Sequence, residues 1–326
     1  MATMPILITG AAGFIGSHVA LHLMTRGERV VGVDNLNDYY DVRLKQARLD
    51  RLTAHDAFTF IKADISDRNA MLALAGAHPE ITGIVHLAAQ AGVRHSLIDP
   101  YTYIQSNVMG QVVMLELAKQ LPRLRHFVYA SSSSVYGGNT ELPFNVDQPV
   151  EKPNSLYAAT KRADELIGYT YAHLFGIPAT GLRFFTVYGP WGRPDMALFI
   201  FTRAILEGRP ISVFNHGDMW RDFTYVDDIV NGVVRVLDRP ATGVPPHKIY
   251  NLGNNRSEKL LDFIGTLEAA LGRKAEKKLE PIQPGDVPRT CADIEESRRD
   301  LGFEPATPIS EGIPKFVTWY RKYYGV

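Results

Sequence analysis

Tyr157 and Lys161 have the residue types and the spacing to remove a proton from an alcohol. They stand four residues apart in the segment Tyr-Ala-Ala-Thr-Lys, which places a phenol and an ammonium group on one face of a helix. A phenol ionises well above neutral pH, but a neighbouring cation favours the phenolate. The spacing therefore indicates a general base, Tyr157, assisted by Lys161. Ordinary surface pairs share this spacing, so the assignment depends on the accompanying motifs.

Four consecutive serines supply hydroxyl groups nearby in the sequence. Residues 131–134 follow the apolar run 127–130, Phe-Val-Tyr-Ala, and lead into Val-Tyr-Gly. The hydroxyls therefore leave a predicted buried strand at its carboxyl end, where doubly wound sheets bind ligands. A serine run can also be a flexible turn, but such turns rarely follow a strand so directly and lead into an aromatic residue and a glycine.

A glycine loop predicts a dinucleotide site. Gly10, Gly13 and Gly16 lie between an apolar run and a helical pattern, where backbone N–H groups can approach a pyrophosphate. A close helix–strand contact would also explain the glycines alone. Asp34 ends the next apolar run, about 20 residues on, where a carboxylate can accept hydrogen bonds from adenosine ribose hydroxyls. Because this carboxylate would repel a 2′-phosphate, the pattern predicts NAD rather than NADP.

The elements that must position these residues alternate between strand and helix. Apolar runs predict the strands, and helical spacing predicts the helices between them. Strands are expected at 6–8, 30–33, 58–61, 83–87, 127–130 and 179–185, and helices at 17–24, 68–75, 107–120 and 157–175. This alternation predicts an α/β fold, a Rossmann-type doubly wound parallel sheet with right-handed crossovers.

The regular alternation ends at Gly189, after which prolines separate shorter elements. We therefore expect residues 1–180 to form an NAD-binding domain and residues 181–326 to supply a smaller, mixed α/β lobe. A helix and a strand expected within 225–253 could return to the first sheet and complete the first domain.

The composition excludes several classes of protein. The 326 residues hold 35 basic and 35 acidic side chains, so the formal net charge is zero and a nucleic-acid surface is not expected. No run of about twenty apolar residues predicts a membrane-spanning helix, and residues 1–10 lack the pattern of a secretory signal. The single cysteine, Cys291, cannot form an internal disulfide, which favours the cytoplasm. His18 and His22 share a helix face without an evident third ligand, so no metal site is expected.

In combination, these motifs resemble those of the extended short-chain dehydrogenase/reductases of the nucleotide-sugar epimerase and dehydratase group. The resemblance covers essentially the whole chain, with the motifs in the family's order. Besides those above, the matching motifs are Asp64-Ile65, His86-Leu-Ala-Ala89, Arg183-Phe-Phe and Arg221-Asp-Phe-Thr-Tyr-Val-Asp-Asp228. The resemblance implies that the second lobe binds a UDP-sugar and that the helices expected at 107–120 and 157–175 form a homodimer.

The same resemblance implies roles for individual residues. The residues that would bind NAD are Gly10, Gly13, Phe14, Ile15, Gly16, Asp34, Asn35, Asp64, Ile65, Leu87, Ala88, Ala89, Tyr157 and Lys161. Ser132 matches the catalytic hydroxyl, and Arg221 and Asp286 match contacts to the nucleotide diphosphate. In the implied reaction, Tyr157 takes the proton of the sugar 4-hydroxyl while hydride moves from C4 to NAD⁺. If the 4-keto sugar rotates and takes the hydride back on its other face, C4 is inverted.

Two departures from the family pattern narrow the implied reaction. Dehydratases carry an acidic pair after the catalytic hydroxyl and uronate decarboxylases carry a glutamate there, whereas this chain has Ser133 and Ser134. Thr186 stands where many sugar epimerases have asparagine. These three neutral hydroxyls could donate to a substrate carboxylate without like-charge repulsion. Arg193 adds a cation nearby, although it could instead contact the diphosphate or lie exposed in its loop.

Segments 34–48 and 187–197 are similar to those of UDP-glucuronate 4-epimerases, which implies UDP-glucuronate and UDP-galacturonate as the substrate pair. Two alternatives stay open. The chain could be a 4-epimerase of neutral UDP-hexoses such as UDP-glucose and UDP-galactose, or a regulator that binds NAD without performing chemistry. Such regulators often lose the tyrosine and the lysine, and this chain keeps both Tyr157 and Lys161.

Overall fold

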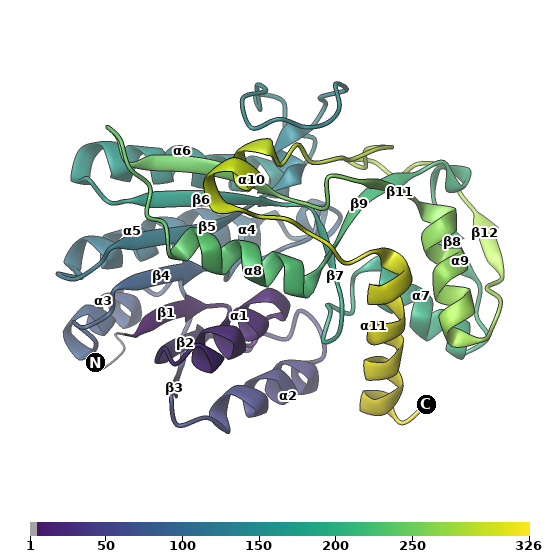
Figure 1. The fold of residues 1–326 in the computed structure, drawn as a ribbon, viewed down its shortest axis with the longest axis horizontal. Coiled ribbons are helices and arrows are strands. Elements are labelled where there is room, and N and C mark those ends of the chain that lie inside the picture. The colour runs from purple at the N-terminus through teal and green to yellow at the C-terminus, as the bar shows by residue number, and fades with distance from the viewer. Residues whose placement is uncertain (1–4) are drawn as a thin grey trace.

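A seven-stranded sheet forms the centre of the molecule (Figure 1). The computed structural model describes residues 5–326, so part of the segment examined for a secretory signal lies outside the described residues. The strand order is β10-β6-β5-β4-β1-β2-β3, and every neighbouring pair is parallel. The strands are β1 (Ile6–Thr9), β2 (Val30–Asp34), β3 (Phe58–Lys62), β4 (Gly83–His86), β5 (His126–Ser132), β6 (Ala179–Phe184) and β10 (His247–Leu252). The predicted Rossmann-type sheet is confirmed.

Helices cover both faces of this sheet because successive side chains of a strand point to opposite sides. Ile6 and Ile8 of β1 belong to one core and Leu7 to the other. In one layer α1 packs against α2 and α8, and in the other α5 packs against α3 and α6. These helices are α1 (Phe14–Thr25), α2 (Val42–Thr53), α3 (Arg68–Ala77), α5 (Gly110–Gln120), α6 (Leu156–Phe175) and α8 (Val226–Leu237).

The expected strands and helices of this half are confirmed, except for differences at their ends and in two helices. The sequence did not predict α2, because its buried face, Leu44, Lys45, Arg48, Leu49 and Leu52, mixes charged residues into the apolar repeat. The helix expected at 107–120 is preceded by α4 (Pro100–Tyr103), and its first residues belong to a π-helical turn, η2 (Ile104–Met109). Such turns occur frequently at functional sites.

The rest of the chain forms a smaller mixed α/β part, on the right in Figure 1. Its sheets have the strand orders β11-β9-β7 and β12-β8. The strands are β7 (Thr186–Tyr188), β8 (Ile211–Val213), β9 (Trp220–Tyr225), β11 (Ser257–Lys259) and β12 (Lys277–Leu279). The helices are α7 (Ala197–Leu206), α9 (Leu260–Leu271) and α11 (Ile309–Tyr324), with the single turn η4 (Asn215–Gly217). Helix α10 (Glu295–Leu301) packs against β10 and α8 of the larger part, to which the single turns η1 (His95–Leu97) and η3 (Ser133–Tyr136) also belong. Strand β10 returns to the large sheet beside β6.

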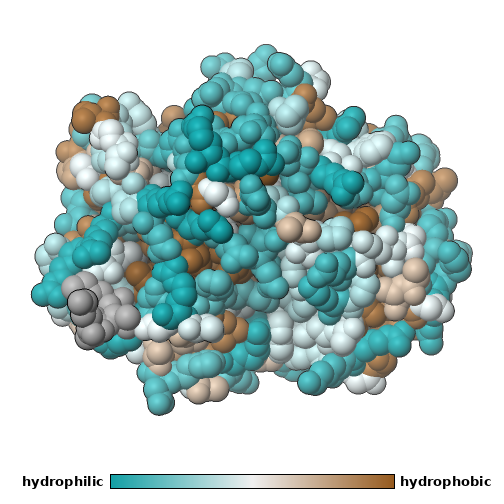
Figure 2. Space-filling model, in the orientation of Figure 1, coloured by the Kyte–Doolittle hydropathy of each residue, from teal (hydrophilic) through white to brown (hydrophobic). Residues whose placement is uncertain are grey.

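The face of the molecule in Figure 2 is largely hydrophilic, with small hydrophobic patches. None of the helices within residues 5–326 has the length and apolar character needed to cross a lipid bilayer. Over the same residues, no three His, Cys, Asp or Glu side chains are grouped so that they could hold a metal ion.

A buried ion pair joins α6 to β5 and β6. The Glu165 carboxylate accepts hydrogen bonds from Arg183 Nε at 2.8 Å and Nη2 at 3.0 Å. Ser131 Oγ donates to it at 2.7 Å and Arg162 Nη1 at 2.9 Å. Burial raises the pKa of Glu165, but hydrogen bonds and charge from Arg183 lower the pKa overall, so the carboxylate stays ionised at neutral pH. The pair fixes the helix that carries Tyr157 against the sheet.

Replacing Glu165 by glutamine should cost about 3–5 kcal/mol of unfolding free energy, because it leaves the buried Arg183 charge without its anion. Arg162→Met is the matched control. Its side chain bonds the same carboxylate but is 33% exposed, and exposed pairs contribute about 0–1 kcal/mol. Urea unfolding at neutral pH measures the free energy of unfolding of both variants. Equal losses of unfolding free energy would contradict a larger contribution from the buried pair.

Candidate active site

One cavity of about 1030 Å³ lies at the carboxyl ends of the central strands and extends to the smaller part of the chain. Gly10 follows β1, Asp34 ends β2, Leu87 follows β4 and Ser132 ends β5. Every residue predicted to bind NAD or substrate lines this cavity. They are Gly10, Gly13, Phe14, Ile15, Gly16, Asp34, Asn35, Asp64, Ile65, Leu87, Ala88, Ala89, Ser132, Ser133, Ser134, Tyr157, Lys161, Thr186, Arg193, Arg221 and Asp286.

The glycine loop has no room for side chains. Gly10 has φ +71°, and a β-carbon there would lie 2.9 Å from the backbone nitrogen of Ala88. At Gly13 and Gly16 a β-carbon would lie 2.8 and 2.1 Å from the Gly10 carbonyl oxygen. Gly13 is also the N-cap of α1, whose first turn holds no acidic residue. The loop therefore offers bare backbone at a helix N-terminus, which suits a pyrophosphate.

Asp34 lies beside this loop with spare acceptor capacity. Its Oδ2 accepts the Ala12 N–H at 3.0 Å and its Oδ1 accepts the Leu36 N–H at 2.9 Å. An ionised carboxylate offers about four acceptor sites, so two remain for ribose hydroxyls. The glycine cradle and this carboxylate together fit the pyrophosphate and the adenosine ribose of NAD.

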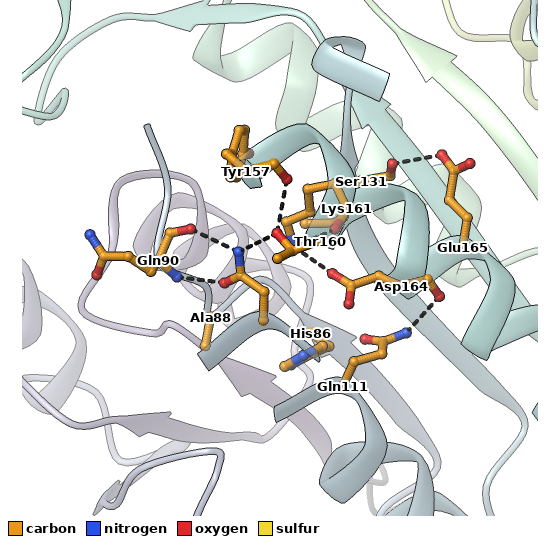
Figure 3. A network of polar contacts seen from close by, with 12 residues as sticks. His86, Ala88, Gln90, Gln111, Ser131, Tyr157, Thr160, Lys161, Asp164 and Glu165 are labelled. Carbon is orange, nitrogen blue, oxygen red and sulfur yellow. Dashed lines mark hydrogen bonds and ion pairs between the residues drawn. The ribbon is translucent and has the colours of Figure 1, made fainter. Parts of the chain in front are cut away.

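Tyr157 and Lys161 reach the cavity from the first two turns of α6 (Figure 3). The helix begins after Ser155, whose hydroxyl accepts the Ala158 N–H at 3.1 Å. Lys161 Nζ, almost fully buried, donates to the carbonyl oxygen of Ala130 and to Asp164 Oδ2, both at 2.9 Å. These two acceptors hold the ammonium group one helical turn from Tyr157.

The sequence analysis missed Asn107, which connects this helix to the loop after β4. Its Nδ2 donates to the Gln90 carbonyl at 3.0 Å and to Thr160 Oγ1 at 2.9 Å, and its Oδ1 accepts the Gln90 N–H at 2.8 Å. Thr160 Oγ1 in turn donates to the Tyr157 carbonyl at 2.8 Å (Figure 3). No local pattern in the sequence indicates this role, because Asn107 acts from a π-helical turn.

The hydroxyl groups form a neutral wall of the cavity. Ser132 Oγ donates to Ser134 Oγ at 3.0 Å and accepts the Ser134 N–H at 3.2 Å. Ser133 lies in the same turn, η3, and Thr186 begins β7. Ser131 plays a different role, because its hydroxyl donates a hydrogen bond to Glu165. Ser132, Ser133, Ser134 and Thr186 therefore supply neutral hydroxyls to the lining of the cavity that also holds Tyr157.

Arg193 is not an exposed loop charge, because its side chain is only 22% exposed. Its Nε donates to Asp195 Oδ1 at 3.0 Å, its Nη2 pairs with Asp195 Oδ2, and Nη2 also donates to the Ala91 carbonyl at 3.4 Å. The Tyr39 hydroxyl donates to Asp195 Oδ2 at 3.3 Å. Burial and the Asp195 charge raise the pKa of Tyr39 to about 12, so it stays a donor. The sequence did not indicate a role for Asp195.

A second group of charges lies at another part of the cavity wall. Arg221 Nη2 bonds Asp286 Oδ1 at 3.4 Å, and Arg94 Nη2 lies 3.6 Å from Asp286 Oδ2. The Arg94 guanidinium also lies 4.7 Å from the centre of the Phe214 ring. The sequence analysis named Arg221 and Asp286 but missed Arg94, whose only signal is its position shortly after the His86-Leu-Ala-Ala89 motif.

Comparison with known proteins agrees with this geometry. Residues 6–253 match the model of the NAD-dependent epimerase/dehydratase family. The chain is 46% identical over 332 residues to UDP-glucuronate 4-epimerase 2 of Arabidopsis thaliana, an alignment that covers 98% of this chain and 76% of that protein.

Solved structures agree as well. The structure of UDP-glucuronic acid 4-epimerase from Bacillus cereus in complex with UDP-glucuronic acid and NAD is 34% identical, with a TM-score of 0.91 over 98% of this chain and 100% of that chain. The structure of UDP-glucose 4-epimerase from Thermotoga maritima with UDP-glucose is 30% identical, with a TM-score of 0.88 over 98% of this chain and 100% of that chain.

Asp164, the buried partner of Lys161, should make stability depend on pH. Its Oδ1 has no hydrogen-bond partner in the described part of the chain, and burial raises its pKa from 3.8 to about 6 despite Lys161. Because the folded-state pKa lies above the unfolded value, the folded protein binds the extra proton first as pH falls. Asp164 therefore adds stability as pH decreases from 7 to 5, by about 1 kcal/mol.

Asp164→Asn removes the titrating group and keeps the shape of the side chain. Urea unfolding of both proteins at pH 7 and pH 5 should show the wild type gaining about 1 kcal/mol relative to the variant at the lower pH. Stability curves that stay parallel over this range would show that Asp164 does not take up a proton there.

Proposed function

The chain belongs to the NAD-dependent epimerase/dehydratase family, and we propose that it is an isomerase that interconverts UDP-glucuronate and UDP-galacturonate at C4 through a 4-keto intermediate. One observation carries the choice of a uronate. The cavity that holds Tyr157 and Lys161 is also lined by Ser133, Ser134 and Thr186, with Arg193 among the same lining residues. Neutral hydroxyls and one cation suit a carboxylate, whereas acidic side chains at these positions would repel it.

We propose that residues 1–180, completed by 225–253, hold NAD and that the remainder binds the nucleotide sugar. The glycine loop would receive the pyrophosphate, Asp34 and Asn35 the adenosine ribose, Asp64 and Ile65 the adenine, and Ala88 and Ala89 the middle of the dinucleotide. When bound, NAD supplies an oxidant that accepts a hydride from a sugar carbon and can return it. Arg221 and Asp286 would hold the diphosphate of the substrate.

The residues of the chain manage the proton. Tyr157 removes it from the sugar 4-hydroxyl as C4 is oxidised, and it returns the proton when C4 is reduced from the other face. Lys161, fixed by the Ala130 carbonyl and Asp164, holds its ammonium group one helical turn from the phenol. Ser132 donates to the same sugar oxygen. The cycle leaves the oxidation state of the sugar unchanged, so the outcome is inversion at C4.

The wall of hydroxyls has a second task in this reaction. Oxidation of a uronate at C4 gives a β-keto acid, which readily loses CO₂ when its C5–C6 bond aligns with the carbonyl π system. Ser133, Ser134 and Thr186 would hold the carboxylate so that this alignment is avoided.

We also propose that the protein is a cytoplasmic homodimer. Leu166, Tyr169 and Phe175 on α6 are each about half exposed, as is Met109 just before α5. A second copy would bury this apolar surface, whose exposure is otherwise costly. Cys291 is a free thiol, which is compatible with a reducing compartment.

Purified protein given UDP-glucuronate and no added cofactor should form UDP-galacturonate, with deuterium at C4 retained in the product. Tyr157→Phe should slow this turnover by about 10²–10⁴-fold, because the general base is lost. Chromatography of the products measures both. Turnover of UDP-glucose without UDP-glucuronate would instead support a neutral hexose epimerase, and bound NAD with no turnover of either sugar would support a regulator.

Removing one of the hydroxyls that line the cavity should increase the formation of a decarboxylated by-product. We expect Ser133→Ala and Thr186→Val to raise the fraction of UDP-pentose among the products, because a loosened carboxylate can align for loss of CO₂. Thr186→Ser, which keeps the hydroxyl, is the matched control and should stay close to the wild type. Clean epimerisation at an unchanged rate in both of the first two variants would refute the clamp.

A further inference from the structure

Arg48, in the second turn of α2, is the largest of the fully buried side chains in the described part of the chain, and it is completely shielded from solvent. Its Nε donates to the Trp191 carbonyl at 3.0 Å, and its Nη2 donates to the carbonyls of Trp191 at 2.7 Å and Gly192 at 3.0 Å. Its Nη1 donates to the Ala12 carbonyl at 3.2 Å and to the Tyr40 hydroxyl at 2.6 Å. All five bonds end on uncharged oxygens.

This buried cation has no carboxylate partner among the residues that the structure describes. Burying a charge is costly unless hydrogen bonds and counter-charge compensate for it. The next basic residue on the helix is Arg51, which stacks on the Trp191 ring at 4.6 Å. Burial and the charge of Arg48 lower the pKa of Arg51. Packing alone could be achieved here with an apolar side chain, so the guanidinium is better explained by the backbone groups that it joins.

Those backbone groups belong to the two sides of the active site. Ala12 lies inside the glycine loop, and its N–H is bonded to Asp34. Trp191 and Gly192 directly precede Arg193, in the loop between β7 and α7. Trp191 has φ +63°, a conformation that favours glycine, so this loop is held in a strained shape. One rigid guanidinium therefore sets the distance between the glycine loop and the backbone that carries Arg193.

We propose that Arg48 is a positioning residue for uronate recognition. Arg48 clamps residues 191–192 to the glycine loop. It would thereby place Arg193 where the substrate carboxylate binds, next to the loop against which NAD would bind. This inference rests on the proposed function. Lysine cannot replace arginine here, because an ammonium lacks the planar fork of donors that reaches carbonyls on both sides.

The test compares Arg48→Met with Arg51→Met, a matched control one turn along α2 that removes a cation from Trp191 but none of the bonds to backbone carbonyls. NAD-loaded protein is titrated with UDP and with UDP-glucuronate, and turnover products are separated. A misplacement of about 1 Å can cost about a hundredfold in rate. We therefore expect Arg48→Met to lower UDP-glucuronate turnover by about ten- to a hundredfold and raise the UDP-pentose fraction.

The affinity for UDP separates positioning from a general structural role. We expect Arg48→Met to lower the affinity for UDP-glucuronate while the affinity for UDP stays within about twofold of the wild type. We expect Arg51→Met to leave both affinities unchanged. Equal weakening of both ligands, or no change in either, would overturn the inference. Should Arg48→Met not fold, Arg48→Lys provides the same comparison, since a lysine keeps the charge but lacks the fork of donors that reaches the carbonyls on both sides. A wild type that binds UDP but does not convert UDP-glucuronate would contradict the proposed function instead.

Discussion

In a parallel sheet every strand runs in the same direction, so all carboxyl ends lie at one edge, and the active site depends on this constraint. Strands β1, β2, β4 and β5 pass directly into residues that line the cavity. The glycine loop at 10–16 and the serines at 131–134 therefore line the same cavity. Helix α6 adds Tyr157 and Lys161 to this edge, and the buried Glu165–Arg183 pair keeps that helix in register with the sheet.

The features predictable from sequence are those that a short segment determines by itself. The glycines, Asp34 and the Tyr157/Lys161 pair could be predicted to lie at one cavity, because a turn, a strand end and a helix face each follow from neighbouring residues. The bonds that the sequence did not reveal join distant segments. Asp195 meets Tyr39 across 156 positions, and Arg48 meets Trp191 across 143 positions. No local spacing predicts such pairs, and charged residues on the buried face of α2 concealed the helix itself.

Three cations that line the cavity each have a carboxylate partner within the protein. Lys161 is paired with Asp164, Arg193 with Asp195 and Arg221 with Asp286. Each carboxylate fixes the orientation of its cation and reduces the net positive charge that an anionic substrate meets. A UDP-uronate carries several negative charges, and an unpaired set of arginines would bind the product as tightly as the substrate. Pairing each cation with a carboxylate therefore fixes its orientation at the expense of affinity for an anionic ligand. This suits a reaction whose product is nearly identical to its substrate and must be released.

The proposed inversion also demands that the 4-keto sugar rotate while its carboxylate stays restrained. A single strong ion pair would resist that rotation, because breaking it in a cavity of low polarity is costly. The hydroxyls of Ser133, Ser134 and Thr186 would instead offer several weaker bonds that can be exchanged one at a time. Arg193, already bonded to Asp195, would hold the carboxylate less firmly than a free guanidinium would. Several exchangeable hydroxyl donors would therefore let the sugar ring rotate while they keep its carboxylate from aligning for the loss of CO₂.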